Sequence, residues 1–239
     1  MKTISFFLFF SLAITTVAQI NHFPNLQKVD VDKSMQVFIK YESANTQLIQ
    51  KKLSQLPTND PQYSDDDMES DNVKVMETTL DVKSKERYII VYSPGLSADP
   101  AFIFYKKSKP ENACFSVGGL GLYLTGNGTF YVTGHINNTF DIHRKFKIEN
   151  DSILEVKQSF HYVGLKTKTN QPITLFADKE QKEIVAQLPS GCNIEVLLSD
   201  TEEDFTYLIK TEFGLIGWTH FDMIFQKDIQ IKGLYFRGD

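Results

Sequence analysis

A cysteine and three histidines are the residues of this chain that could support nucleophilic catalysis. They are Cys114, His135, His143 and His161. An imidazole that takes the thiol proton creates a thiolate nucleophile, and a third polar group orients the ring. Cys114 lies in residues 113–119, however, where the pattern is typical of a strand entering a turn. A Cys-His site is therefore an alternative and not our main interpretation.

The same histidines could instead serve as metal ligands. His135 and His143 could approach each other across the Asn137-Asn138 turn, with Asp141 as a third ligand. The histidines show neither the HxH nor the HExxH spacing of common zinc sites. We therefore predict no metal site and no cofactor.

Residues 135–141 concentrate amide, imidazole and carboxylate groups at the expected end of a hairpin. In ligand sites, aromatic faces supply contact area and side-chain amides supply direction. Two interpretations stay open for this tip. It is either a saccharide- or peptide-binding surface that uses His135, Asn137 and Asn138, or a solvated turn whose side chains cap backbone groups.

Composition favours a globular β protein. The 239 residues are 41% apolar and 13% aromatic, with 19 Phe and 10 Tyr against a single Trp. The formal net charge is -5, and acidic residues concentrate in the segment 60–71. Because the chain lacks a basic footprint, we expect no nucleic-acid partner.

The N-terminus has the pattern of a secretory signal peptide. Lys2 is followed by an apolar run over residues 4–14 and by small residues through Ala18. We expect residues 1–19 to be removed, and the mature protein to be exported, either periplasmic or secreted. The apolar run is too short to cross a bilayer stably, and no later segment has spanning length, so we expect no stable membrane span.

Two cysteines occur in this exported chain, Cys114 and Cys192. They could pair and staple the two halves of the protein together, or both could remain free thiols. A count of two does not fix the geometry that a disulfide needs, so both possibilities stay open.

Short strands bounded by Gly, Pro, Asn or Asp follow one another along most of the chain. We expect residues 20–169 to form an antiparallel β meander that closes into a barrel or packs as a sandwich. The expected strands are 35–41, 73–80, 87–92, 101–105, 122–125, 129–134, 140–148, 153–157 and 162–169.

One short helix is expected over residues 44–56. Ile49, Leu53 and Leu56 recur at helical spacing there, and Pro57 ends the pattern. The polar residues 58–72 that follow are expected to form a solvated acidic loop.

Four apolar segments follow one another in residues 173–224. Ile173-Thr174-Leu175-Phe176 comes first, an apolar run then leads through a Pro-Ser-Gly turn at 189–191, and the last two segments are Tyr207-Leu208-Ile209-Lys210 and Gly214-Leu215-Ile216-Gly217-Trp218. This order resembles the bacterial SH3 domain (SH3b), a small β-barrel module, over 52 of the 239 residues. We therefore expect an SH3-like barrel over residues 170–226 and a further strand or tail over residues 227–239.

Alternation of side chains within this segment predicts which residues face the barrel core. Ile194, Val196 and Leu198 alternate with their neighbours, as do Tyr207 and Ile209. A half-buried strand places such alternating apolar residues on its inner face.

The SH3b resemblance implies an envelope role. Candidate ligands are cell-wall peptides or glycan, and candidate surface residues are Tyr207, Trp218 and Phe221. Bacterial SH3 modules are often joined to Cys-His peptidases of the NlpC/P60 type, which cut peptidoglycan stems. That family places its cysteine in an Asp-Cys-Ser-Gly-like motif at the start of a helix, and the residues around Cys114 do not match it.

We therefore expect an exported, mostly β, two-domain protein without catalysis. Its SH3b module would contact cell-wall peptide or glycan, or an envelope protein. One alternative is an NlpC/P60-like peptidase that uses Cys114, His135 and His161 on peptidoglycan. Another is a purely structural module that docks proteins in an envelope complex.

Overall fold

The computed structural model describes residues 23–54, 71–95, 99–221 and 230–238. The expected signal peptide and most of the acidic loop lie outside these ranges. Strands make up most of the described chain, and the helical element among them is one short 3-10 turn, η1 (Ser43–Asn45). None of the described helical segments has the length and apolarity needed to cross a membrane. The protein is mostly β, as its composition predicts.

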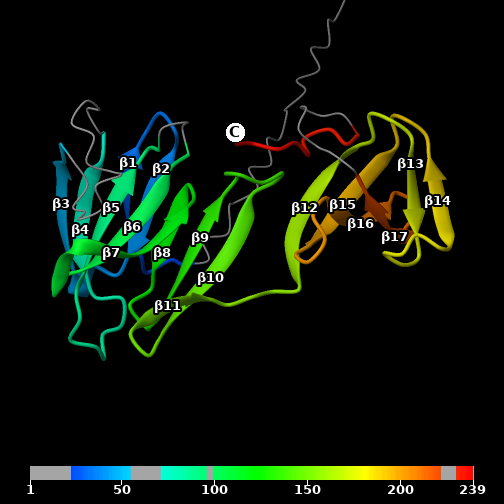
Figure 1. Ribbon diagram of the computed structural model, residues 1–239. Coiled ribbons are helices and arrows are strands. Elements are labelled where there is room, and N and C mark those ends of the chain that lie inside the picture. The colour runs from blue at the N-terminus through cyan, green and yellow to red at the C-terminus, as the bar shows by residue number, and fades with distance from the viewer. Residues whose placement is uncertain (1–22, 55–70, 96–98, 222–229, 239) are drawn as a thin grey trace, which may run out of the picture.

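Two sheets form the N-terminal lobe (Figure 1). The first has the order β1-β2-β8-β9-β10-β11, with bounds Gln27–Asp32, Val37–Tyr41, Gly121–Leu124, Thr129–Gly134, Ile142–Glu149 and Ser152–Glu155. The second has the order β3-β4-β5-β6-β7, with bounds Thr46–Lys52, Val73–Thr78, Tyr88–Ser93, Ala101–Lys106 and Lys109–Gly118.

The two sheets pack face to face as a sandwich around one apolar core. Ile39, Leu122 and Phe130 of the first sheet are fully buried in the same cluster as Ile90 and Phe104 of the second. The Phe104 and Phe130 rings stack with centroids 5.2 Å apart. Alternating apolar residues on both inner faces supply this core, which is the usual construction of a β-sandwich.

One pairing departs from the expected antiparallel meander. Strand β2 pairs with β8 in parallel, with Phe38 opposite Gly121 and Tyr41 opposite Leu124. The whole second sheet lies between these two strands in the sequence. A connection of that length permits a parallel return, whereas a short hairpin does not.

The helix expected over residues 44–56 is wrong. Residues 46–52 form strand β3, which pairs with β4. A β-bulge lies between Leu48 and Lys51, and Gln50 there has φ 51°. Ile49 and Leu53 nevertheless line one groove with Lys51 between them, because residues two and four apart share a face of a strand. A four-residue spacing therefore fits a strand as well as a helix.

The C-terminal lobe is a single antiparallel sheet. Its order is β12-β15-β16-β17-β13-β14, with bounds Phe160–Lys168, Asn193–Asp200, Thr206–Thr211, Ile216–His220, Ile173–Phe176 and Ile184–Leu188. Hydrogen bonds between these described strands do not close it into a barrel. Strand β12, which precedes the expected domain start at residue 170, pairs with β15 along its length.

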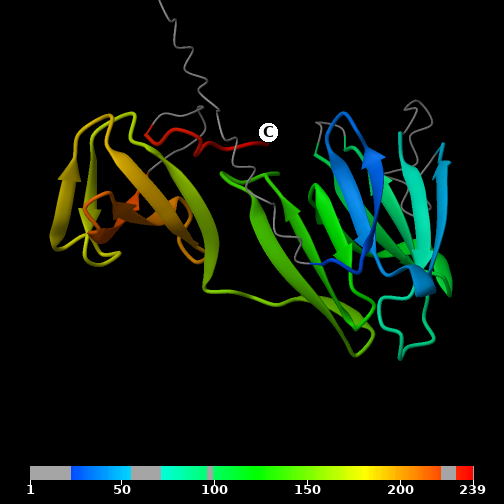
Figure 2. The same ribbon diagram turned by 180° about the vertical axis from the view of Figure 1, so that it is seen from behind.

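Residues 230–238, here called the tail, join the two lobes (Figures 1 and 2, red). Beside β12, Ile231 forms a β-bridge with Thr169, and the Lys232 amide donates to the Lys168 carbonyl at 3.1 Å. The same tail then reaches the β9–β10 connection of the other lobe. The segment expected to be a further strand therefore pairs through isolated bridges.

Three backbone contacts fix the far end of the tail to the N-terminal lobe. His135 Nε2 lies 2.9 Å from the Tyr235 carbonyl oxygen. The Asn137 amide donates to the Arg237 carbonyl at 2.6 Å, and the Arg237 amide donates to the Asn138 carbonyl at 2.9 Å. The tail is thus hydrogen-bonded to both lobes.

The inner face of the C-terminal sheet is covered from outside the sheet. Its core contains Leu175, Val196 and Ile209, which are fully buried. Three buried side chains from outside the sheet complete the same cluster: Phe140 of the N-terminal lobe, and Ile231 and Leu234 of the tail.

We expect Leu234→Ala to lower the free energy of unfolding of the C-terminal lobe by about 2–5 kcal/mol, because truncation leaves a cavity in this core. Leu234 is 1% exposed, whereas Leu154, the matched control, is 43% exposed. Leu154→Ala should change stability by no more than about 0.5 kcal/mol. Urea unfolding followed by fluorescence of the single tryptophan, Trp218, measures both. Equal effects of the two changes would contradict a core role for the tail.

Candidate functional site

Five apolar side chains form a continuous line across the outer face of the C-terminal sheet. Residues directly opposite each other on paired strands share a face. Four such pairs connect the line, which we call the apolar row: Tyr162 with Leu198, Leu198 with Leu208, Leu208 with Trp218, and Trp218 with Phe176. The row crosses β12, β15, β16, β17 and β13.

A β-bulge in β15 brings Leu198 into this row. Ile194 and Val196 are buried on the inner face, as their alternation predicts. The register shifts between Val196 and Leu198, however, so Leu197 is an extra residue in the strand. Leu198 therefore lies opposite Leu208 on the outer face, and its predicted place in the core is wrong.

The apolar row is open to solvent to different degrees. Tyr162 is 69% exposed, and the other four members are partly buried. Phe160 extends the aromatic surface, since its ring centroid lies 5.8 Å from that of Trp218. Lys179 Nζ lies 5.9 Å from the centroid of the Trp218 ring. The row thus combines aromatic faces with a nearby cation, a combination that suits recognition of polar ligands with apolar faces.

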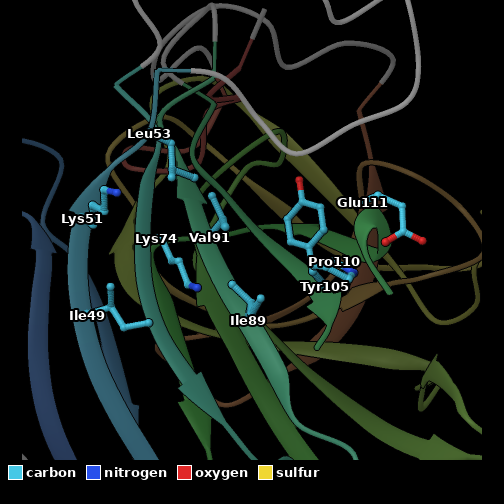
Figure 3. A pocket seen from close by; sticks show the side chains of 9 residues that line it. All are labelled: Ile49, Lys51, Leu53, Lys74, Ile89, Val91, Tyr105, Pro110 and Glu111. Atoms are coloured by element: carbon cyan, nitrogen blue, oxygen red, sulfur yellow. The ribbon is translucent and has the colours of Figure 1, made fainter. Parts of the chain in front are cut away.

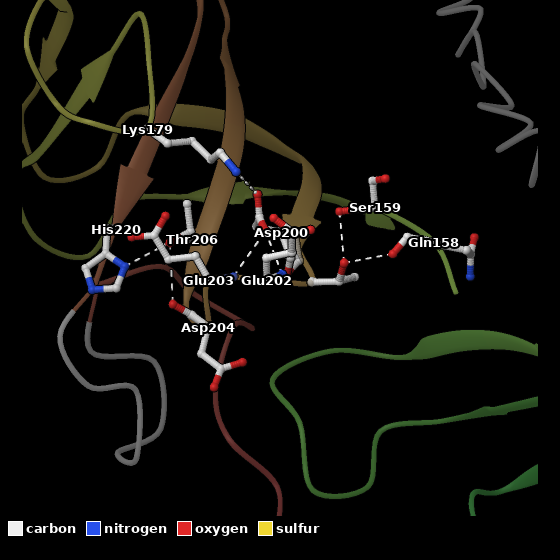
Figure 4. Close-up of polar contacts among 11 residues, drawn as sticks. Gln158, Ser159, Lys179, Asp200, Glu202, Glu203, Asp204, Thr206 and His220 are labelled. Atoms are coloured by element: carbon white, nitrogen blue, oxygen red, sulfur yellow. Dashed lines mark hydrogen bonds and ion pairs between the residues drawn. The ribbon is translucent and has the colours of Figure 1, made fainter. Parts of the chain in front are cut away.

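A buried carboxylate anchors this cation (Figure 4). Lys179 Nζ lies 2.7 Å from Asp200 Oδ2, and the Asp200 side chain is 1% exposed. The amides of Glu202 and Glu203 donate to Asp200 Oδ1 at 2.8 and 3.1 Å. Burial alone would raise the pKa of Asp200, but the hydrogen bonds from Lys179 and the two amides outweigh it and hold the pKa below its usual value.

Further hydrogen bonds fix the acidic turn beside the row. The Thr201 hydroxyl contacts the carbonyl oxygens of Gln158 and Ser159 at 2.7 and 3.0 Å (Figure 4). Thr206 Oγ1 lies 2.9 Å from His220 Nδ1. The turn is therefore tied both to the segment that enters β12 and to the end of β17.

Two of the expected surface aromatics lie in the core. Tyr207 is 1% exposed and Phe221 is 7% exposed, and their ring centroids are 6.0 Å apart. The Tyr207 hydroxyl hydrogen-bonds Thr139 of the N-terminal lobe at 2.6 Å, and burial raises the pKa of Tyr207 to about 12. Burial removes both rings from the expected ligand face, and Trp218 remains on it.

The polar tip of the N-terminal lobe is engaged with the tail. His135, Asn137 and Asn138 all contact tail residues through the bonds described above. Asn138 Nδ2 also donates to the Ile136 carbonyl at 2.8 Å. The His135 and Asn138 side chains thus contact backbone carbonyls, whereas Asn137 contacts the tail through its own backbone amide.

The cysteine and the histidines of the alternative site lie apart. Cys114 is in β7, where its Sγ donates to the Phe104 carbonyl at 3.2 Å. The residue is exposed, yet partial desolvation of the thiol raises its pKa. His161 is in β12 of the other lobe, with its ring centroid 6.5 Å from that of Phe140. Among the described residues, no histidine hydrogen-bonds Cys114.

The structure also bears on cysteine pairing and on the metal site considered for the histidines. Both cysteines, Cys114 and Cys192, are free. His143 Nε2 lies 3.4 Å from Asp141 Oδ2, an exposed contact. In the part of the chain that the structure describes, no three His, Cys, Asp or Glu side chains gather in a way that could hold a metal ion.

Sequence patterns identified Trp218 but missed its neighbours on the outer face. Phe160 and Tyr162 alternate along β12, which was a signal for one shared face. The ion pair of Lys179 with Asp200 spans 21 residues and had no local signal.

On acidification, the C-terminal lobe of the Lys179→Met variant should unfold at a higher pH than that of the unaltered chain. Because the folded pKa of Asp200 lies below the unfolded value of about 3.9, Asp200 stabilises the fold above that pH, and this contribution is lost as pH falls through the folded pKa. Removing the ammonium raises the folded pKa, so the loss begins at higher pH. Acid unfolding followed by Trp218 fluorescence tests this, with Lys182→Met as the control. Identical midpoints for the two variants would count against it.

Tyr207→Phe should lower the free energy of unfolding by about 1–3 kcal/mol, because it leaves the buried Thr139 hydroxyl without its partner. Thr139→Val should have a similar cost for the converse reason. Removing both hydroxyls should cost less than the sum of the single changes, since neither polar group then remains unpaired. A double-mutant cycle by urea unfolding measures the coupling. Strictly additive costs would show that the bond does not couple the lobes.

Aromatic and charged groups thus lie together on the outer face of the C-terminal sheet. They form the apolar row, the adjoining cation and a rigid acidic turn. Comparison with known proteins found no family model that matches this chain, and no match among curated proteins or solved structures. The function is therefore inferred from the sequence and the geometry.

Proposed function

We propose that the protein is an exported, non-catalytic binding or scaffolding protein whose C-terminal lobe contacts cell-wall peptide or glycan. The observation that carries this proposal is the apolar row, which leaves Tyr162 and Trp218 accessible on the outer face of the sheet. Aromatic side chains combine a large apolar face with a polar group, which suits ligands of mixed character. The resemblance of residues 173–224 to bacterial SH3 domains supports the same class of ligand.

Charged groups continue the outer face beside the row. Lys166 lies opposite Glu195, and Glu195 lies opposite Lys210. These residues line a shallow hollow of about 460 Å³. Cell-wall peptides carry both amines and carboxylates, so a surface with lysines and glutamates next to aromatic rings complements them.

A second candidate function is structural. The inner face of the C-terminal sheet packs against Phe140, and Thr139 bonds Tyr207 at 2.6 Å. Together with the tail, these contacts favour a rigid two-lobed unit that positions other proteins within an envelope complex. In this case the outer face would meet a protein partner instead of the wall.

The mature chain, residues 20–239, should sediment with insoluble peptidoglycan sacculi. Tyr162→Ala should weaken this binding about tenfold or more, because it removes an aromatic contact from the row. Tyr162 is exposed, so the change should leave the fold intact. Phe213→Ala is the matched control, since Phe213 is 89% exposed and lies outside the row.

The same incubation separates the alternatives. Soluble muropeptide release that Cys114→Ala abolishes would favour the peptidase and overturn our proposal. Absence of sedimentation by the unaltered chain would reject the wall ligand and favour the structural role. Equal loss in the Tyr162 and Phe213 variants would show that the apolar row is not the binding surface.

A further inference from the structure

A groove of about 520 Å³ lies on the outer face of the second sheet of the N-terminal lobe (Figure 3). Small-molecule sites commonly have volumes of this order. The groove is on a different lobe from the apolar row. It is lined by Ile49, Lys51, Leu53, Lys74, Ile89, Val91, Tyr105, Pro110 and Glu111.

The floor of the groove is apolar and separate from the main core. Val91, Ile103 and Tyr105 form a buried cluster of their own, against which Leu53 and Ile89 pack. This cluster faces away from the interior of the sandwich, because the main core takes the alternate residues Ile90 and Phe104. Val91 and Tyr105 are themselves covered, at 0% and 2% exposure, so the apolar surface that a ligand can reach is that of the residues packed beside them, including Leu53 and Ile89.

Two lysines stand directly opposite each other at one side of this floor. Lys51 of β3 pairs with Lys74 of β4, and Lys74 in turn pairs with Val91 of the floor. Both lysines adjoin β-bulges, which locally change the direction of side chains. Like charges in directly opposed positions destabilise a sheet. Glu77 already pairs with Lys74, and an added anion would pair with Lys51.

One carboxylate on this side is shared between two lysines. Glu77 contacts Lys107 at 2.7 Å and Lys74 at 3.0 Å, and hydrogen bonds from Lys107 and then Lys74 hold the pKa of Glu77 below its usual value. The side-chain ammonium of Lys51 makes no hydrogen bond or ion pair with any residue in the described ranges. This side of the groove therefore carries an excess of positive charge, whereas Glu111 lies on the other side (Figure 3).

We propose that this groove binds a small amphipathic carboxylate of the fatty-acid class. Its alkyl chain lies along the partly exposed Ile49, Leu53 and Ile89, and its carboxylate lies at Lys51, beside Lys74. Burial of the chain supplies most of the affinity, and the lysines select an acid over the corresponding alcohol. The site is independent of the proposed wall-binding surface.

Isothermal titration of the mature chain with decanoate, kept below its micelle concentration, tests the site. We expect saturable one-to-one binding that Lys51→Gln weakens about tenfold or more, as the loss of a charge-assisted contact requires. Lys51 is exposed, so this change should preserve the fold. Lys166→Gln, on the other lobe, is the matched control and should bind as the unaltered chain does.

Two further measurements separate the charge from the chain. Decanol, which has the same chain without the carboxylate, should bind at least about tenfold more weakly than decanoate. Ile49→Ser should weaken both ligands, with circular dichroism confirming that the variant is folded. Lack of saturable decanoate binding by the unaltered chain, or equal affinity of the Lys51 and Lys166 variants, would overturn the proposal. Neither result bears on sedimentation with sacculi.

Discussion

Side chains from outside the C-terminal sheet complete the burial of its inner face. A single sheet needs a second layer to exclude water from its apolar side. Here that layer is assembled from two distant parts of the chain, namely Phe140 of the N-terminal lobe and Ile231 and Leu234 of the tail. The arrangement of the two lobes follows from this requirement, because the residues that cover the sheet are attached to both of them.

This requirement also assigns different roles to the two faces of the sheet. The inner face is closed by the tail and the N-terminal lobe, and its aromatic residues Tyr207 and Phe221 serve stability. On the outer face Tyr162 is 69% exposed and Trp218 is partly exposed. A similar division holds in the N-terminal lobe, where the second sheet buries one face in the sandwich and presents a groove on the other.

Local patterns in the sequence predicted the mostly β fold and part of the core. Ile194, Val196 and Ile209 lie inside, because strand alternation depends only on neighbouring residues. The same rule failed at the β-bulge that places Leu198 outside. The four-residue spacing in β3 was misread as helical, although a strand repeats at that spacing too. A bulge is determined by the pairing of a strand with its neighbours, and this information is absent from the strand's own pattern.

The candidate site was harder to predict than the fold. Trp218 was identified from its segment, but the apolar row exists only because five strands meet in one register. The burial of Tyr207 depends on Thr139, which is 68 residues away in the sequence. Contacts at that separation follow from tertiary packing and leave no periodic signal.

The contact between His135 and Tyr235 joins residues that are 100 positions apart. Contacts between distant residues form slowly, because the entropy of closing the intervening loop must be overcome before the contact contributes. The hairpins of each lobe close over much shorter loops and can form earlier. We therefore expect the two lobes to join late in folding. Until they do, the apolar inner face of the C-terminal sheet is exposed, and the chain can aggregate or be bound by chaperones.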